Sequence, residues 1–287
     1  IQLTRHNQGL LLHQERYTKK VLDRFHMSSA KPVNTPLPTK TVLTSETNEH
    51  LLLDSEKATL YRAIVGALMF LMVCTRPDLA FALSQLSKFS AKPGKKHLEA
   101  AEHTLRYLKG TQKRGIFYQQ ATASDKKFPL IGFSDSAFAD DPDNRRSTSA
   151  FLFVLNGSAV AWKSKQQSLV SRSTHDAEYI GLANASYEIT WLRRLLSSLL
   201  QHSDAITEPT DLRGDNQSAI TTAHAPLDAV SSPRTKHIDI RFHIIREAIH
   251  RGDIKLTYTR TESMVADALT KAYHLLFIKS IWLVWVF

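Results

Sequence analysis

The sequence predicts an α/β protein in which a mixed β-sheet with flanking helices follows a mainly α-helical segment. The first half carries apolar residues at helical spacing on either side of a Pro-rich stretch. The second half reads as three strands, then helix, strand, helix, strand and helix, which implies a mixed sheet covered by helices. With 287 residues, 43% of them hydrophobic, the chain can form two domains that each bury a core.

The first element is expected to be a strand, followed by an amphipathic helix. "GLLLHQ" (9–14) predicts the strand, and "ERYTKKVLDRFHM" (15–27) places Tyr17, Val21 and Phe25 on one helical face. "SSAKPVNTPLPTKT" (28–41) is rich in Pro, Ser and Thr and cannot continue a helix. We interpret it as a linker.

The rest of the first half predicts three helices. Residues 58–90 have apolar positions at helical spacing that are interrupted at Pro77, so we expect a pair of packed helices. Residues 95–111 predict a third helix that ends near Gly110, a residue well suited to a helix C-cap.

The second half predicts five strands and four helices. The strands are expected at residues 129–139, 146–158, 159–166, 210–215 and 253–259. A hairpin turn at Asn156-Gly157 would join the second and third of them. The helices are expected at residues 173–200, 216–223, 236–252 and 263–272.

Charge favours a polyanionic partner. The net charge is +10, and residues 92–114 alone hold seven Lys or Arg against two Glu. That stretch is either a surface that follows phosphates or a solvated helix face. Cys74 is the only cysteine, which excludes a disulfide framework and a Cys-based zinc site and fits a reducing compartment.

Neither end of the chain indicates export. The start lacks the layout of a secretory signal. The apolar end, "LLFIKSIWLVWVF", is shorter than the roughly 20 residues of a membrane span. We therefore expect an intracellular protein (in a cytoplasmic particle or the nucleus) that is not secreted and has no membrane partner.

Asp135 is the first acid in a position that structure alone does not explain. It lies inside a predicted strand and shares a face with Ile131, Phe133 and Ala137. Burying an unpaired charge is costly. Asp135 should therefore be paired or bind a ligand.

Glu178 is the second such acid. Its helix begins near Ser173, which forms a capping box with Asp176 and gives that acid a structural role. Glu178 has no such role, and it heads the apolar face that would dock on the sheet: Gly181, Leu182, Ala185, Ile189, Leu192 and Leu196. We interpret Glu178 as functional, with a buried ion pair as the alternative.

Asp215 and Asp267 complete the set of candidate acids. Asp215 ends a predicted strand, and ligands of open mixed sheets collect at the carboxyl ends of strands. Arg213-Gly214-Asp215 also reads as a cell-adhesion signal, but a receptor ligand should be secreted. Asp267 lies one turn into the last predicted helix and would alone be an ordinary helical acid.

Four carboxylates suit Mg²⁺, which prefers carboxylate and water ligands. Two such ions about 4 Å apart can activate a water and stabilise a leaving oxygen, the chemistry of phosphodiester cleavage. A His-based zinc site is less well supported, because His237 and His243 lack a close partner at ligand spacing.

Several motifs resemble a known family. The stretch from "SDSAFADDPDNRRSTSAF" to "STHDAEY", with "RGDNQSAI", "RTKHIDIRFHIIRE" and "VADALTK", resembles the ribonuclease H domain of copia-type LTR retrotransposon Pol polyproteins. "YRAIVGALMFLMVCTRPDLAFALSQLSKF" and "HTLRYLKGTQKRGIFY" resemble the end of the reverse transcriptase in the same polyproteins. The resemblance extends to about Ala272.

The resemblance implies a domain organisation. Residues 1–118 would be the C-terminal thumb and connection segment of a reverse transcriptase, and 125–272 a ribonuclease H-like domain with a five-stranded mixed sheet. Residues 273–287 form a divergent apolar tail. The palm and fingers of the polymerase would lie upstream in the same polyprotein. The sequence contains no "YVDD"-like stretch, so we expect no polymerase activity.

The resemblance also implies the reaction. The domain would hydrolyse the RNA strand of RNA–DNA hybrids with two Mg²⁺ ions, or Mn²⁺ in their place. Asp135, Glu178 and Asp215 would be the core metal ligands and Asp267 the fourth. Gln217 and Asn216, in "DNQSA", would contact the hybrid, and 2′-hydroxyl recognition would select RNA.

Three features of the sequence are not explained by the resemblance, and two rival functions stay open. His175-Asp176 differs from the usual family residues before Glu178, His237 in "KHIDIR" has no assigned role, and the family pattern ends after Lys271. The first rival is an inactive remnant that binds nucleic acid. The second is a strand-transfer integrase, against which the acid order argues, because the Glu comes second and not last.

Overall fold

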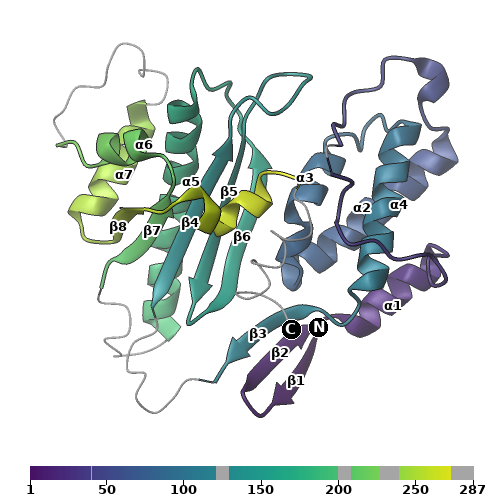
Figure 1. Cartoon of the computed structure of the whole chain (residues 1–287), viewed down its shortest axis with the longest axis horizontal. Helices are drawn as coiled ribbons and strands as arrows, with labels where there is room; N and C mark the ends of the chain where they lie inside the picture. The colour runs from purple at the N-terminus through teal and green to yellow at the C-terminus, as the bar shows by residue number, and fades with distance from the viewer. Residues whose placement is uncertain (40, 121–128, 200–207, 227–238, 273–287) are drawn as a thin grey trace. The chain divides into compact units, whose positions relative to one another are not determined.

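The computed structural model describes residues 1–39, 41–120, 129–199, 208–226 and 239–272 (Figure 1). The chain divides into two compact units, Ile1–Gln120 and Ala121–Thr270. The predicted boundary between residues 118 and 125 stays a prediction, because residues 121–128 lie outside the described part. The apolar tail at 273–287 and His237 also lie outside it.

Unit 1 combines a three-stranded antiparallel sheet with four helices. Its strands are β1 (Gln2–His6), β2 (Gly9–His13) and β3 (Gly115–Gln119), in the order β1-β2-β3. Its helices are α1 (Glu15–Arg24), α2 (Ser55–Cys74), α3 (Ala80–Ser87) and α4 (Lys95–Gly110), with short 3₁₀ turns η1 (Glu49–Leu51) and η2 (Pro77–Leu79). The predicted strand at 9–14, the helices and the interruption at Pro77 are confirmed, whereas β1 and β3 were not predicted.

α4 ends at Gly110 as predicted, but Gly110 is not its C-cap. Gly110 is the last helical residue, and the C-cap is Thr111 at φ −131°. The Thr111 hydroxyl donates to the carbonyl of Tyr107 at 2.9 Å. That bond satisfies the last turn, so the chain leaves the helix without a glycine in the left-handed region.

The core of unit 1 is formed by α2, α3 and α4, whose buried residues include Tyr61, Leu68, Leu83 and Leu105. By length and composition alone α2 is also apolar enough to cross a membrane, as core helices of soluble proteins often are. Its buried face belongs to this core.

A buried ion pair also lies in unit 1. Arg76 and Asp78 have side chains only 1% and 3% exposed and meet at 2.7 Å. The Tyr107 hydroxyl donates to the same carboxylate at 2.7 Å. Burial alone would raise the pKa of Asp78, but the Arg76 charge and the two hydrogen-bond donors outweigh it and hold that pKa below its ordinary value.

Unit 2 contains the predicted five-stranded mixed sheet. Its strands are β4 (Leu130–Ala137), β5 (Thr148–Leu155), β6 (Ser158–Gln166), β7 (Thr210–Gly214) and β8 (Ile254–Tyr258), in the order β6-β5-β4-β7-β8. The pairs β4–β5 and β5–β6 are antiparallel, and β4–β7 and β7–β8 are parallel. Asn156 and Gly157 both have positive φ, 48° and 79°, as the predicted hairpin turn between β5 and β6 requires.

Helices cover one face of this sheet. Figure 1 shows α5 (Thr174–Leu199), α6 (Gln217–Ala223) and α7 (Asp239–His250) together, and α5 contacts β4, β5 and both other helices. A Cβ at Gly181 of α5 would lie 2.5 Å from the Ser136 hydroxyl of β4, so α5 lies on the face that Ser136 presents. Side chains alternate along a strand, which places Asp135 on the other face.

The last predicted helix, 263–272, is wrong in type. The segment forms two 3₁₀ turns instead, η5 (Thr261–Ser263) and η6 (Val265–Leu269). Met264 between them is extended at φ −78°, ψ 94°, and so interrupts any continuous α-helix. This C-terminal segment contacts β4 and β5 through η6.

Candidate active site

The strand register brings two of the predicted acids together. β4 and β7 run parallel, with Ile131 opposite Asp211 and Phe133 opposite Arg213. Asp135 and Asp215 each follow the last of these pairs by two residues. Because neighbouring strands lie about 4.8 Å apart, both acids reach the same carboxyl end of the sheet. The interpretation of Asp215 as a strand-end acid agrees with this placement.

The third acid enters from α5. Ser173 accepts a hydrogen bond from the Asp176 backbone N–H at 3.1 Å, so it caps the helix as predicted. The Asp176 carboxylate accepts from the Arg172 N–H at 3.3 Å, rather than from Ser173 as a standard capping box would have it. Asp176 therefore has a structural role. Glu178 lies one turn in, where the absence of a side chain at Gly181 lets α5 approach β4 closely.

Asp135, Glu178 and Asp215 form one cluster, which we call the acid cluster. One carboxylate oxygen from each lies within 4.8 Å of the other two. Asp135 and Glu178 are only 2% and 6% exposed. Like charges so close and so shielded from water repel strongly, and a cation among them removes that repulsion.

The donor set fits hard divalent cations. It consists of carboxylate oxygens from two strand ends and one helix, the ligand type that Mg²⁺ and Mn²⁺ accept. Three carboxylates can also be shared between two neighbouring ions.

Two threonines support the acid cluster, and sequence reasoning did not identify them. Thr270, only 1% exposed, donates its hydroxyl hydrogen bond to the Asp135 carboxylate. Thr261 donates to the Asp215 carboxylate at 2.9 Å. The C-terminal segment therefore fixes two of the three acids. Thr270 follows Asp267 by three residues within "VADALTK", and that motif was the available signal.

The other predicted site residues are placed as follows. Asp267 lies on η6 and is 2% exposed, but it is not one of the three acids whose oxygens converge. Asn216 is the N-cap of α6, and its side chain accepts from the Ala219 N–H at 2.9 Å. Gln217, the first residue of α6, is exposed. Their predicted contacts with a substrate stay predictions.

The histidine that departs from the family pattern is held in place. His175 lies 3.4 Å from the Asp176 carboxylate through Nδ1 and 3.1 Å from the Thr222 hydroxyl through Nε2. It also stacks on Tyr179 at a ring distance of 6.0 Å. His175 therefore links the first turn of α5 to α6, beside Glu178.

The strand order, the parallel pair at the sheet centre and the acids at its carboxyl end define a ribonuclease H-like domain. Among solved structures, the N-terminal ribonuclease H domain of a Mycobacterium tuberculosis protein is 10% identical and aligns with 54% of this chain and 99% of that chain, with a TM-score of 0.35. A TM-score of 0.35 is too low to support a fold assignment. The assignment therefore rests on the strand order of the sheet. No family model matches the chain.

Comparison with curated protein sequences shows the family to which the chain belongs. The chain is 39% identical over 272 residues to the retrovirus-related Pol polyprotein from transposon TNT 1-94 of Nicotiana tabacum, which covers 93% of this chain and 19% of that protein. It is 36% identical over 271 residues to the corresponding polyprotein from transposon RE2 of Arabidopsis thaliana, 94% of this chain and 18% of that one. The chain belongs to the retrovirus-related Pol polyproteins of transposons, as its resemblance to copia-type elements predicts. It spans about a fifth of the length of these relatives.

Proposed function

We propose that unit 2 is a metal-dependent endonuclease that hydrolyses the RNA strand of RNA–DNA hybrids. The acid cluster carries the proposal: three carboxylates from distant parts of the sequence converge within 4.8 Å, on a sheet of ribonuclease H type. Membership of the Pol polyproteins supports the substrate class, because the resemblance of unit 1 implies a reverse transcriptase in the same polyprotein.

Asp135, Glu178 and Asp215 would hold the cations through their oxygens, two Mg²⁺ ions or Mn²⁺ in their place. When bound, the cations would activate the attacking water and stabilise the leaving oxygen. Thr270 and Thr261 act through the acids, because their hydrogen bonds set the orientation of two carboxylates.

Asp267 is proposed as the fourth acid. It is buried on η6, and the Thr270 hydroxyl that binds Asp135 lies 3.0 Å from the Asp267 carbonyl. Gln217 and Asn216 are proposed to contact the hybrid. They open α6, directly after Asp215, so a duplex at the acid cluster would pass them.

The surrounding polyprotein and the cellular location are also part of the proposal. Unit 1 would adjoin the palm and fingers of a reverse transcriptase in a longer polyprotein, and the hybrid would be made inside the cell, in a particle or the nucleus. The basic stretch at 92–114, with seven Lys or Arg against two Glu, would attract the duplex backbone.

The test is a cleavage assay of the full chain with an RNA-labelled hybrid and Mg²⁺. Hydrolysis of the RNA strand is expected, with loss in Asp135→Asn and no loss in Glu262→Gln, which removes an exposed acid of the C-terminal segment. Salt-sensitive binding without cleavage would indicate an inactive remnant and overturn the proposal. Strand joining in place of hydrolysis would overturn it in favour of strand transfer.

A further inference from the structure

An aromatic and basic surface lies on α5 away from the acid cluster. Tyr187 and Trp191 are 56% and 55% exposed and stand one helical turn apart on the same side. At 1.5 Å per residue, they lie roughly 14 and 20 Å along the helix from Glu178. This surface, which we call the α5 platform, comprises Lys163, Lys165, Tyr187, Trp191, Arg194 and Arg241.

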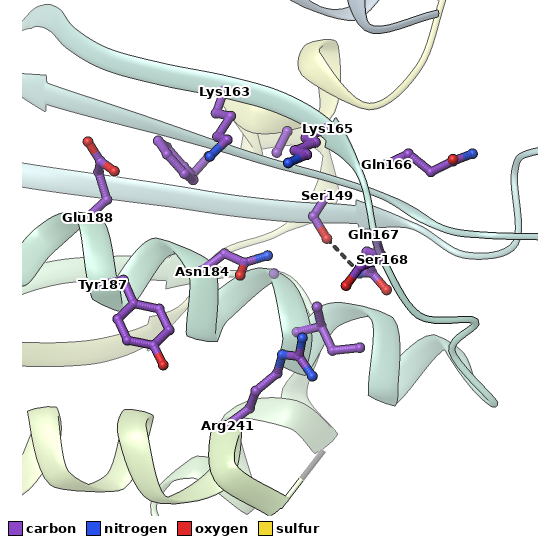
Figure 2. Close-up of a pocket in the computed structure, with 14 residues that line it drawn as sticks. Ser149, Lys163, Lys165, Gln166, Gln167, Ser168, Asn184, Tyr187, Glu188 and Arg241 are labelled. Atoms are coloured by element: carbon purple, nitrogen blue, oxygen red, sulfur yellow. Dashed lines mark hydrogen bonds between the residues drawn. The ribbon is translucent and has the colours of Figure 1, made fainter. Parts of the chain in front are cut away.

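Two hollows of the surface meet at Tyr187. The first, about 280 Å³, lies between β6 and α5, with Lys163 and Lys165 on its strand side and Asn184 on its helix side (Figure 2). The second, about 350 Å³, lies between α5 and α7 and is lined by Trp191 and Arg194. Tyr187 lines both hollows, and we call the two together the track.

The position of the lysines follows from the strand register. Lys163 pairs with Phe151 and Lys165 with Ser149 across β5 and β6. Phe151 belongs to the core beneath α5, so both lysines point to the α5 face of the sheet. β6 is an edge strand, and its outer side leaves the first hollow open to a ligand.

The charge of the platform is strongly positive. Within the part of the chain that the structure describes, Lys163, Lys165, Arg194 and Arg241 take part in no ion pair. Glu247, in the second hollow, is paired with Arg251 at 2.9 Å. This leaves one acid on the lining of the track, Glu188, against four cations.

We propose that the α5 platform binds single-stranded nucleic acid. Exposed aromatic rings beside unpaired cations suit a chain of bases and phosphates, because every base can stack and every phosphate is an anion. Tyr187 and Trp191 would stack successive bases, while Lys163, Lys165 and Arg194 would contact phosphates. Four unpaired cations disfavour a typical protein partner, whose interface core is depleted of charge. The binding requires neither metal nor cleavage and so goes beyond the proposed nuclease.

The test is fluorescence anisotropy of the full chain with a labelled 15-residue oligo(dT) or oligo(rU), in EDTA and low salt. Tyr187→Ala and Trp191→Ala should each weaken binding by roughly 5- to 100-fold, since each removes one stacking partner. Tyr187→Phe keeps the aromatic ring and should bind the oligonucleotide as tightly as wild type. Leu195→Ala, which removes an exposed apolar side chain one turn beyond Trp191, should leave it unchanged.

The charge contribution is tested by salt dependence. Lys163→Gln with Lys165→Gln should reduce the slope of log affinity against log salt by about 1.4, at about 0.7 per phosphate contact on a single strand. The control is Lys255→Gln on β8, the opposite edge of the sheet, which should not change the slope.

Folded aromatic variants with wild-type affinity would overturn the proposal. So would self-association of the wild type that Trp191→Ala abolishes, because the platform would then bind a second copy. EDTA prevents hydrolysis, so the outcome is independent of whether the acid cluster is a nuclease.

Discussion

Replacing one carboxylate of the acid cluster should stabilise the metal-free protein. In Asp135→Asn the side chain keeps its shape and can still accept the Thr270 hydrogen bond, but its charge is lost. Wild type in EDTA carries three acids within 4.8 Å of one another, two of them buried. The variant removes two of the three repulsive pairs.

The size of the effect follows from two limits. Two unit charges at 4.8 Å repel by roughly 3.5 kcal/mol at an effective dielectric constant of about 20, so two pairs amount to about 7 kcal/mol. Movement of the side chains and screening by dissolved ions relieve part of that repulsion in the wild type. The gain in unfolding free energy is therefore about 1–4 kcal/mol, or roughly 3–12 °C in Tm for a unit of this size.

The assay is differential scanning calorimetry of the full chain, with EDTA and then with Mg²⁺. Asp135→Asn should melt higher than wild type in EDTA and gain little from Mg²⁺, whereas wild type should gain through binding. Asp176→Asn is the matched control. It alters another buried acid on α5, one that accepts from the Arg172 backbone N–H just before the helix, and should lower Tm while keeping the Mg²⁺ response.

An Asp135→Asn variant that melts below wild type in EDTA would refute the reasoning. It would show that the carboxylate is neutralised by groups of the protein itself. The acid cluster would then be a structural network that needs no cation.

Three further predictions concern metal affinity, the stability of unit 2 and the acid stability of unit 1. Thr270→Val should lower Mg²⁺ affinity about 10- to 100-fold in calorimetric titration, because Asp135 loses its orienting donor; unchanged affinity would contradict that role. Gly181→Ala should destabilise unit 2 by about 1–3 kcal/mol in urea unfolding, since its Cβ would lie 2.5 Å from the Ser136 hydroxyl; a neutral result would show that α5 shifts freely. The folded-state pKa of Asp78 is lowered, so its stabilisation of unit 1 is present above the unfolded value of about 3.9 and lost as pH falls below it. Acid titration of the Tm should show that loss, and Asp78→Asn should lack it.

The spacing of apolar residues and the turn residues was enough to predict most helices and strands from the sequence. The strands β4 to β8 and the helices α5 to α7 show clear periodicity of apolar residues. The pair Asn156-Gly157 identifies the hairpin turn between β5 and β6. β1 and β3 escaped prediction because they are short edge strands of a small sheet, where partly exposed residues leave no clean alternation. The last helix was given the wrong type because its backbone closes tighter local bonds, such as Asp267 N–H to the Met264 carbonyl at 3.1 Å, and because Met264 is extended.

The acid cluster was predictable as a set of residues but not as a geometry. Asp135 and Glu178 stood out because each interrupts an apolar face. Their convergence with Asp215 depends on the parallel pairing of β4 with β7, which joins segments about 80 residues apart and has no local signal. The "VADALTK" motif pointed to the segment that holds Thr270, but not to the roles of Thr261 and Thr270, because a hydroxyl acquires its role only from the acid that it meets.

A titration of the full chain with Mn²⁺, followed by the loss of the free-ion paramagnetic resonance signal, tests the central claim most directly. Wild type should bind about two ions, and Asp135→Asn, Glu178→Gln and Asp215→Asn should each lose that binding, while Glu262→Gln retains it. Equal binding by wild type and all three acid variants would contradict the account.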